Sequence, residues 1–487
     1  MSEPDDLQAP SGPAIGQDEW VARHGERRSQ RAGLIGEIEE RARRAPWWAW
    51  LVLFVAAFAL LPVVSHDGYI RRVAFDTTLY MLLALGLNVV VGWGGLLDLG
   101  YAAFYAIGAY AYAMLSSPQF GIHLPTLVSI PIIVVIGAVA GFLVGLPSRR
   151  LIGDYLAIVT LFFLQITQTV LTNGDQIAGH DLTGGANGII NVDPLHLLGH
   201  PLVVQHGGVF AVTYLYISIA TFAVVYLALH FVNHSRTGRA WRSLREDGLA
   251  AEAMGMPVNL LKLMAFSFGA AVAALTGTLF AALQTSVFPL QFSFPLVITV
   301  YTMVILGGQG NLAGVTIGAV VVWVMLEFLR DPGDARILFY VVGLLAIAFA
   351  FGRTRKLAVL LGSLVVFGFA AHAIADAINH DWVSGPAANG FDHALSHWVI
   401  IPTGLANWVG PVSYIGLVCL VLALTLLPAR VRYVALVPTI YLGTFVWENV
   451  LLAQPDATRY IILGVMLIGL MILRPNGLLG ERRVEIV

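Results

Sequence analysis

The sequence NHSRTGRAWRSLREDGLAAEAMGMP, residues 233–257, is a polar stretch in the middle of a very apolar chain. It separates the apolar runs 213–232 and 263–283. On a helix, Trp241 and Leu244 point away from one broad polar flank, because residues three apart drift slowly around the helix axis. That flank carries Arg236, Arg239, Arg242 and Arg245. The pattern predicts a short amphipathic helix between two apolar segments.

A second short helix is predicted directly after the first. Asp247 can cap its beginning, and the helix should end where Gly255 supplies a left-handed turn and Pro257 forbids continuation. Two short helices between two spans form a rigid element that a partner in the water can hold. A solvated, positively charged loop is the alternative interpretation. Trp241 and the compact turn signals favour the partner-binding interpretation, because a loop that only connects two spans needs neither.

The composition is typical of a membrane protein. Of its 487 residues, 58% are hydrophobic and only 11% are charged, with a mean hydropathy of +0.79, whereas ordinary soluble domains carry about 25% charged residues. The net charge of −2 gives no argument for a nucleic-acid partner. The two lysines, Lys262 and Lys356, follow no glycine-rich phosphate loop, so no nucleotide-hydrolysing site is expected. Cys419 is the single cysteine, which excludes disulfides within the chain.

Fourteen apolar runs are candidate spans, several of them short for the ~20 residues that a helical crossing needs. We therefore predict an all-α polytopic membrane bundle of about 12–14 segments, with irregular or re-entrant glycine-rich stretches. The candidate runs are 47–64, 73–91, 99–115, 126–146, 155–172, 213–232, 263–283, 294–307, 313–329, 337–351, 357–376, 411–428, 433–452 and 459–473.

The positive-inside rule orients these spans. Residues 1–46 are hydrophilic and lack the apolar core of a signal peptide, so we expect a cytoplasmic tail. Alternation from there places five basic clusters in the cytoplasm, including the arginines of 236–245, and predicts a cytoplasmic C-terminus. Arg71 and Arg72 disagree, which suggests a re-entrant or miscounted early segment. Residues 173–212 and 377–408 are predicted outer loops, the first rich in turn-forming residues.

The segment 92–108 is too glycine-rich for a plain lipid-facing helix. Irregular backbone at membrane depth is tolerated only where protein or a water-filled cavity surrounds it, so we expect this segment to line the interior. Glycines four residues apart elsewhere let helices approach closely, and packing without a substrate role is the favoured interpretation. These glycines are Gly137, Gly141 and Gly145, and Gly310, Gly314 and Gly318.

Several residues are candidates for a translocation pathway. Asp98 lies in the irregular segment, where an intramembrane carboxylate is a functional candidate and an N-cap is an equally good explanation. Phe104 stands between Gly100 and Gly108. Polar groups inside spans should face the bundle interior, with hydrogen bonding between helices as the alternative; they are Asn88, Gln165 and Gln168. No metal site or hydrolase arrangement is predicted.

The chain resembles the LivM-type permease of ATP-driven branched-chain amino acid importers. The resemblance covers about 70–330 and 457–480. It is carried by LNVVVGWGGLLDLGYAAFYAIGAY at 87–110, GDYLAIVTL at 153–161, GGANGI at 184–189, GRAWRSLREDGLAAEAMGM at 238–256, LGGQGNLAG at 306–314 and LRPNGLLG at 473–480.

This resemblance implies a heteromeric importer. The chain would pair with a LivH-type permease, two cytoplasmic ATPase subunits would use ATP and Mg²⁺, and a soluble binding protein would deliver substrate from outside; the chain itself would bind no cofactor. The loop 233–262 would couple the permease to the ATPases. It matches the pattern Glu-Ala-Ala-x-x-x-Gly except that Leu249 replaces the Glu. The implied coupling residues are Arg239, Trp241, Arg242, Glu246, Asp247, Ala250, Ala251 and Gly255.

The chain departs from the family in one large region. Family members run from the helix ending near Arg330 to the last span, whereas here 332–456 intervenes. We expect an insertion of about four extra spans between a permease core, 47–331, and a closing segment, 457–487. Urea or a short amide is the alternative substrate, and a secondary transporter or channel working alone is the alternative class. The expected location is a bacterial plasma membrane.

Overall fold

The computed structural model describes residues 46–148, 154–176, 181–197, 200–202, 205–206, 209–210, 212–351, 354–385, 395–402, 404, 406, 408–473 and 477–479. The α-helices are α3 (Trp47–Val64), α4 (Gly68–Leu87), α5 (Tyr101–Leu115), α6 (Thr126–Ser148), α7 (Asp154–Thr172), α8 (Val212–His234), α9 (Arg236–Glu246), α10 (Gly248–Ala253), α11 (Val258–Gln284), α12 (Phe294–Gly307), α13 (Leu312–Phe328), α14 (Pro332–Phe351), α15 (Thr354–Ile378), α17 (Val409–Leu426), α18 (Ala429–Val446) and α19 (Pro455–Leu473).

Two π-helices extend α4 and α18, namely η1 (Asn88–Trp93) and η6 (Trp447–Leu451). Single 3₁₀ turns are η2 (Gly174–Gln176), η3 (Gly185–Asn187), η4 (Pro289–Phe292) and η5 (His380–Trp382). Strands of two residues pair antiparallel: β1 (Ser116–Ser117) with β2 (Ile122–His123), β3 (Ile189–Ile190) with β8 (Ser286–Val287), β4 (His196–Leu197) with β5 (His200–Pro201), and β6 (Gln205–His206) with β7 (Val209–Phe210). The predicted outer loop 173–212 is thus built of turns and short strands where it is described.

The prediction of an all-α membrane bundle is confirmed. Within the described residues, ten helices are long and apolar enough to cross a membrane, and α5 and α13 are shorter apolar helices. Together with α14 and α19 they occupy all fourteen predicted runs. Helix ends differ by a few residues where a cap decides them. α4 begins at Gly68 rather than at 73, because the Asp67 side chain accepts a hydrogen bond from the Tyr69 backbone N–H.

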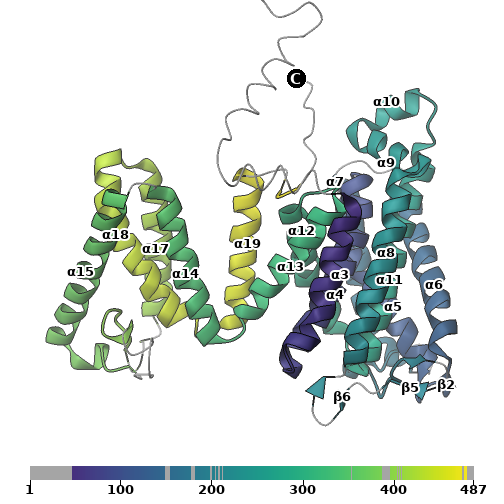
Figure 1. The fold of residues 1–487 in the computed structure, drawn as a ribbon, viewed down its shortest axis with the longest axis horizontal. Helices are drawn as coiled ribbons and strands as arrows, with labels where there is room; N and C mark the ends of the chain where they lie inside the picture. Colours follow the sequence, from purple (N-terminus) through teal and green to yellow (C-terminus); the bar gives the residue numbers. More distant parts are fainter. Residues whose placement is uncertain are drawn as a thin grey trace, which may run out of the picture.

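α11 lies at the centre of the core and packs against α4, α5 and α6 (Figure 1). The close packing expected at the glycines of α6 is confirmed, and the structure shows that its partner is α11. A Cβ at Gly137 would collide with Ala274, one at Gly141 with the Phe266 carbonyl, and one at Gly145 would lie 2.8 Å from Leu263 Cδ2. These contacts bring two helix backbones together where larger side chains would hold them apart.

The glycine-rich stretch is irregular over a shorter range than predicted. The chain leaves α4 through the π-helix η1, runs without helix from 94 to 100, and resumes regular geometry in α5. Most of the segment is buried, as expected, although Gly95 and Leu97 are exposed. Gly108 belongs to a regular helix and packs against the Ala274 backbone of α11.

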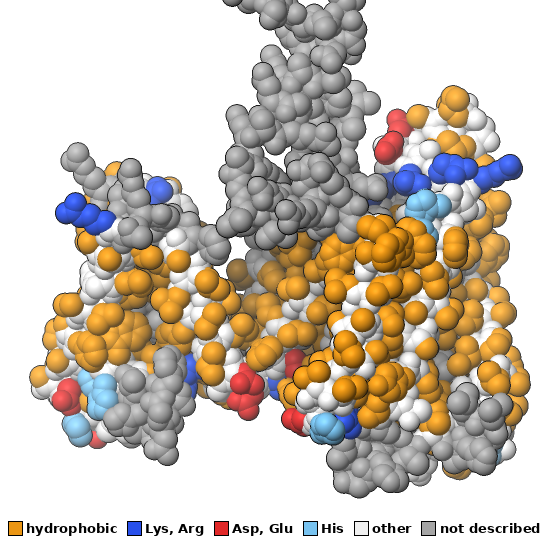
Figure 2. Space-filling view, viewed as in Figure 1, with side chains coloured by type: hydrophobic (Ala, Val, Ile, Leu, Met, Phe, Trp, Pro, Cys, Tyr) orange, Lys and Arg blue, Asp and Glu red, His pale blue; other side chains and the backbone are white. Residues whose placement is uncertain are grey.

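The bundle has two polar ends separated by an apolar band (Figure 2). We call the end with α9 and α10 the loop end and the opposite one the far end. Arg71 and Arg72 lie at the far end, because α4 begins there and η1 reaches α9. The two arginines are therefore not the sign of a miscounted early segment. Arg72 Nε lies 3.1 Å from the Asp76 carboxylate, and Arg71 donates to the Pro62 carbonyl, so local partners hold both cations.

The predicted insertion forms a separate helical group beside the core, made of α14, α15, α17 and α18 (Figure 1). α19 packs against α12 and returns the chain to the core. A small cluster around Leu329, Ala335 and Trp447 joins the two parts. The tail 1–45 and residues 480–487 lie outside the described residues.

Candidate coupling site

α9 is fastened to the end of α8 by its own arginines. Ser235 caps α9, with its hydroxyl oxygen 3.3 Å from the Gly238 N–H. Arg239 Nη1 donates to the His234 carbonyl at 2.9 Å, and Arg242 Nη2 donates to the Asn233 carbonyl at 3.1 Å. Guanidinium groups there satisfy carbonyls that the helix end leaves unpaired and complement its negative dipole end. The polar flank predicted for α9 therefore faces partly inward, onto α8.

Trp241 is the anchor of α9 and is fully buried. Its ring stacks on Trp93 of η1 at a centroid distance of 6.2 Å, and its Nε1 donates to the Leu261 carbonyl of α11 at 2.8 Å. This position corrects the expectation that Trp241 is offered to a partner. An indole that reaches both an apolar pocket and a buried carbonyl is more stable inside than in water.

Arg245 connects α9 to the irregular segment. Its Nη1 donates to the Gly92 carbonyl in η1, and its side chain lies against Gly95. A π-helix widens the turn and leaves carbonyls out of the regular hydrogen-bond ladder, so a cation from another helix can bind one. The last turn of α9 is therefore attached to the point at which the chain leaves α4.

The same point of η1 is attached to the connection between α12 and α13. We call residues 306–311, with 477–479 packed on them, the junction. Trp93 Nε1 donates to the Gly310 carbonyl at 2.9 Å, and the Gly310 N–H donates to Asn88 Oδ1 at 2.8 Å. Asn311 Nδ2 donates to the Leu479 carbonyl at 3.0 Å. Asn88, a candidate for the pathway, is thus fully buried and fulfils the alternative role of bonding between helices.

α10 is the most exposed part of the loop end. The Asp247 carboxylate accepts hydrogen bonds from the Leu249 and Ala250 N–H groups at 2.9 and 3.0 Å, as the predicted cap requires. Gly255 has φ +81°, the left-handed turn expected there. Ala251 is buried and so does not offer its side chain to a partner, whereas Glu246, Asp247, Ala250 and Gly255 are exposed.

Two residues of this surface were not singled out from the sequence. Leu249 is 79% exposed and Met254 is 82% exposed, although both are large and apolar. Two large apolar side chains exposed together at the polar end of the bundle form a candidate contact surface. The signal was present in the sequence as one large apolar residue on a short helix otherwise made of Gly, Ala and Glu, and a second directly after it. Arg245 and Trp93 were also missed as members of the site, because their contacts come from distant parts of the chain.

The remaining pathway candidates lie in different environments. The Asp98 backbone is clamped by Tyr301, whose hydroxyl donates to the Asp98 carbonyl and accepts from its N–H, both at 2.8 Å. The Asp98 carboxylate is buried and accepts from the Gly100 N–H at 2.9 Å. α5 begins three residues later, so Asp98 stabilises the entry to that helix and is not its N-cap. Phe104 is buried against Phe163 of α7.

The two glutamines of α7 do not face the interior of this chain. Gln165 is exposed and Gln168 is half-buried, on a helix whose apolar neighbours Phe162 and Ile166 are also exposed. The expectation that they point inward is therefore wrong within this chain. Burial depends on which neighbouring helices cover a face, and the described helices leave this face of α7 uncovered.

Comparison with known proteins places the chain in a family. The family described as "Branched-chain amino acid transport system / permease component" matches residues 69–351, more than half of the chain. The chain belongs to this permease family. The match includes the candidate coupling site and extends through α14, the first helix of the predicted insertion, and it leaves out α3 and everything after α14.

Individual relatives agree with the family match. The permease is 40% identical over 298 residues to the "High-affinity branched-chain amino acid transport system permease protein LivM" of Salmonella typhimurium, covering 58% of this chain and 68% of the relative. It is 27% identical over 294 residues to a probable LivM of Methanocaldococcus jannaschii, covering 52% and 79%. Over 258 residues it is 26% identical to LivH of Escherichia coli K12, covering 50% and 79%. No solved structure matches the permease.

Proposed function

We propose that this permease is the LivM-type subunit of an ATP-driven importer of branched-chain amino acids. Two cytoplasmic ATPase subunits supply the energy, a LivH-type permease completes the membrane part, and a soluble binding protein delivers substrate. The relatives named above support the substrate class and the pairing of two permeases. The multi-pass bundle supports a plasma-membrane location, with the loop end and both termini in the cytoplasm.

One observation carries this proposal: the exposed helix α10 follows directly on α9, which is fixed to the interior of the bundle. Trp241 and Arg245 attach α9 to η1, and Trp93 attaches η1 to the junction. A force applied to Leu249 and Met254 by an ATPase surface is therefore transmitted to the irregular segment rather than absorbed by a flexible loop. A solvated loop would need none of these contacts.

The mechanism follows from this attachment. ATP binding brings the two ATPase subunits together and displaces α10 with them. η1 and the junction move with α9, and the helices they connect change tilt, so the passage changes from outward to inward facing. Such coupling requires that the ATPases contact the two conformations differently. A leucine or valine side chain suits the apolar interior.

The uncovered face of α7 is the proposed contact with the second permease. Polar side chains at membrane depth are rare against lipid and face protein or a water-filled cavity. Gln165 and Gln168 meet that condition if a second permease lies against α7 and the passage runs between the two subunits. Asp98 lies on the same side of the core, because the N–H of the next residue, Leu99, donates to the Thr160 hydroxyl of α7.

The test is ATP-driven uptake by the purified complex in proteoliposomes, with the binding protein added. Gly255→Val should abolish uptake while the complex still assembles, because a β-branched residue at φ +81° is strained and α10 can no longer end there. Gly248→Ala is the matched control, since its added Cβ would meet only Leu244 Cδ1 at 3.6 Å. Uptake that is unchanged in Gly255→Val, or independent of ATP, favours a transporter working alone. Uptake of urea but not leucine favours the alternative substrate.

A further inference from the structure

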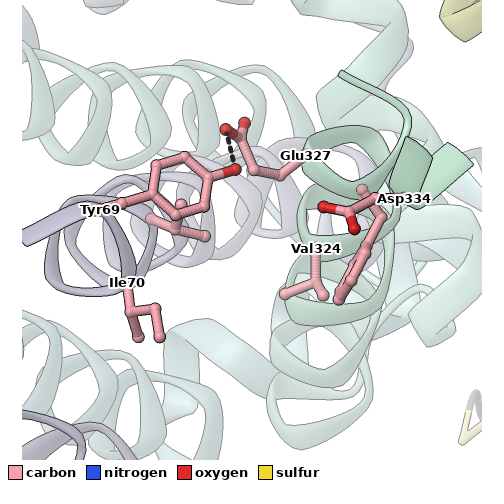
Figure 3. Close-up of a pocket in the computed structure, with 7 residues that line it drawn as sticks. Tyr69, Ile70, Val324, Glu327 and Asp334 are labelled. Atoms are coloured by element: carbon pink, nitrogen blue, oxygen red, sulfur yellow. Dashed lines mark hydrogen bonds between the residues drawn. The ribbon is translucent and has the colours of Figure 1, made fainter. Parts of the chain in front are cut away.

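A cavity of about 160 Å³ opens at the far end, between the core and the inserted helices (Figure 3). α4 contributes Tyr69, Ile70 and Val73 to its wall, α13 contributes Val324, Glu327 and Phe328, and α14 contributes Asp334. The cavity is far from the coupling site, because α4 begins at the far end and η1 ends at the loop end. It plays no part in the transport mechanism proposed above.

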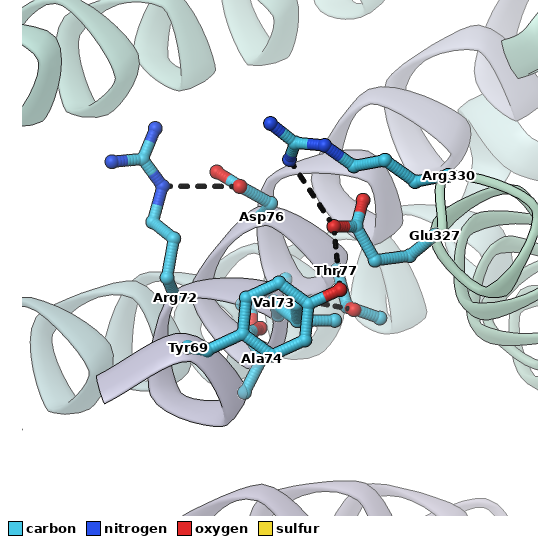
Figure 4. Close-up of polar contacts among 9 residues, drawn as sticks. Tyr69, Arg72, Val73, Ala74, Asp76, Thr77, Glu327 and Arg330 are labelled. Carbon is cyan, nitrogen blue, oxygen red and sulfur yellow. Dashed lines mark hydrogen bonds and ion pairs between the residues drawn. The ribbon is translucent and has the colours of Figure 1, made fainter. Parts of the chain in front are cut away.

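The polar half of the cavity wall carries two carboxylates, Glu327 and Asp334, and the cation Arg330 lies beside it, paired with Glu327 (Figure 4). Glu327 Oε1 accepts a hydrogen bond from the Tyr69 hydroxyl at 2.9 Å and lies 3.3 Å from Arg330 Nη1. The Arg330 side chain is 65% exposed, so it can turn to a second anion. Asp334 faces the same space from α14, and its carboxylate has no hydrogen-bond or ion-pair partner within the described residues (Figure 3).

The other half of the cavity is apolar and continues onto the outer surface of the bundle. Ile70 is 38% exposed and Phe328 is 48% exposed, and the surface beyond them on α13 includes Val321 at 45%. Charged groups therefore lie at the end of an apolar band, which is the arrangement of a bilayer where head groups meet acyl chains (Figure 2). The cavity opens sideways to that band and not only to water.

We propose that this cavity binds one phospholipid with a primary-amine head group, of the phosphatidylethanolamine class. Its ammonium group has three N–H donors for the carboxylates of Glu327 and Asp334, its phosphate lies by Arg330, and an acyl chain follows Val73 and Phe328. A lipid with only negative charge would have no group to pair with the Asp334 carboxylate, and only Arg330, already paired with Glu327, to offset its own charge. A quaternary choline head group has no N–H to donate. The bound lipid would join α13 of the core to α14 of the insertion.

The test is the lipid content of the purified complex, reconstituted in vesicles with equal parts of ethanolamine, choline and glycerol phospholipids and then extracted in mild detergent. Native mass spectrometry should find the ethanolamine lipid retained about tenfold more than the choline lipid, the expected effect of one or two charged hydrogen bonds. Asp334→Asn and Glu327→Gln should each lower that retention several-fold. Asp376→Asn is the matched control, because this carboxylate also lies at the far end but beside His380.

Three outcomes would overturn the proposal. Equal retention of the three head groups, or no change in either variant, would mean that no specific lipid site exists. Displacement of the lipid by millimolar leucine would assign the cavity to an amino acid. Retention of no lipid would mean that the cavity does not hold a phospholipid. Tyr69→Phe removes only the hydroxyl that contacts Glu327, so it tests the site even where Glu327→Gln does not fold. Uptake assays are not needed, so this test can fail while the transport function stands.

Discussion

The core and the insertion are both apolar helical groups, yet they are held together differently. In the most apolar 18-residue stretch of α4 and η1, 83% of the residues are buried, whereas in α17 none is. Core glycines such as Gly92, Gly108 and Gly141 touch other backbone or side-chain atoms, whereas Gly343 and Gly362 of the insertion have nothing within 4 Å of an added Cβ. Close packing of one helix backbone on another is therefore concentrated in the core, whereas in the insertion Gly368 and Gly385 meet Trp398 and Ile401 of a connecting segment. The insertion has few contacts with the core.

The largest effect is expected from one methyl group in the core. A Cβ in Gly92→Ala would collide with Asn88 Oδ1 and lie 2.7 Å from the Gly310 backbone nitrogen, breaking the contact between η1 and the junction. We expect ATP-driven uptake to fall by about 100-fold, since overpacking typically costs a few kcal/mol and about 1.4 kcal/mol corresponds to a factor of ten. Gly362→Ala in α15 is the matched control. Equal uptake by the two variants would contradict the contrast between core and insertion.

The next largest effect is expected at the attachment of α9. Arg245→Met keeps an unbranched chain but removes the hydrogen bond to the Gly92 carbonyl. We expect uptake to fall about tenfold, the value of one charged hydrogen bond, while ATP hydrolysis by the complex continues. Arg236→Met, on the exposed start of the same helix, should leave both activities unchanged. Parallel loss of uptake and hydrolysis would show instead that Arg245 supports assembly.

A smaller effect on uptake is expected from removing the insertion. Deletion of 332–454 joins Asp331 to Pro455 near the cluster where Leu329 packs beside Leu451, Leu452 and Ile462. We expect the shortened permease to assemble and to retain uptake within about threefold of the full chain, as separable domains allow. Uptake by complexes of equal yield is the measurement. Complete loss would mean that α14 to α18 take part in transport.

The smallest effect on uptake is expected from the buried ion pair within the insertion. Glu448 is almost fully buried, with Arg336 Nε 2.9 Å from Oε2 and the Tyr340 hydroxyl 3.2 Å from Oε1. Glu448→Gln leaves the arginine without its countercharge, which typically costs about 3–5 kcal/mol. Proteolysis within 379–408 should accelerate while uptake is unchanged. The double variant with Arg336→Met should restore resistance, and if it does not, the pair is not what holds these helices.

Local signals in the sequence were sufficient for the elements themselves. Apolar run lengths located fourteen candidate spans for a predicted bundle of about 12–14 segments, and Asp247, Gly255 and Pro257 predicted where α10 begins and ends. These features depend on residues within one or two turns of each other. The glycine spacing of α6 likewise predicted close packing, although not the identity of α11 as its partner.

The sequence by itself determined that this chain crosses a membrane many times, carries a structured polar element between two spans and belongs with the LivM-type permeases. Only the tertiary structure decided which side chains face inward: Trp241 is buried, Gln165 is exposed, Asn88 bonds to Gly310, and Asp334 lines the same cavity as Glu327. The reason is physical. Periodicity and capping are set by neighbours along the chain, whereas burial and long-range hydrogen bonds are set by helices that arrive from more than a hundred residues away.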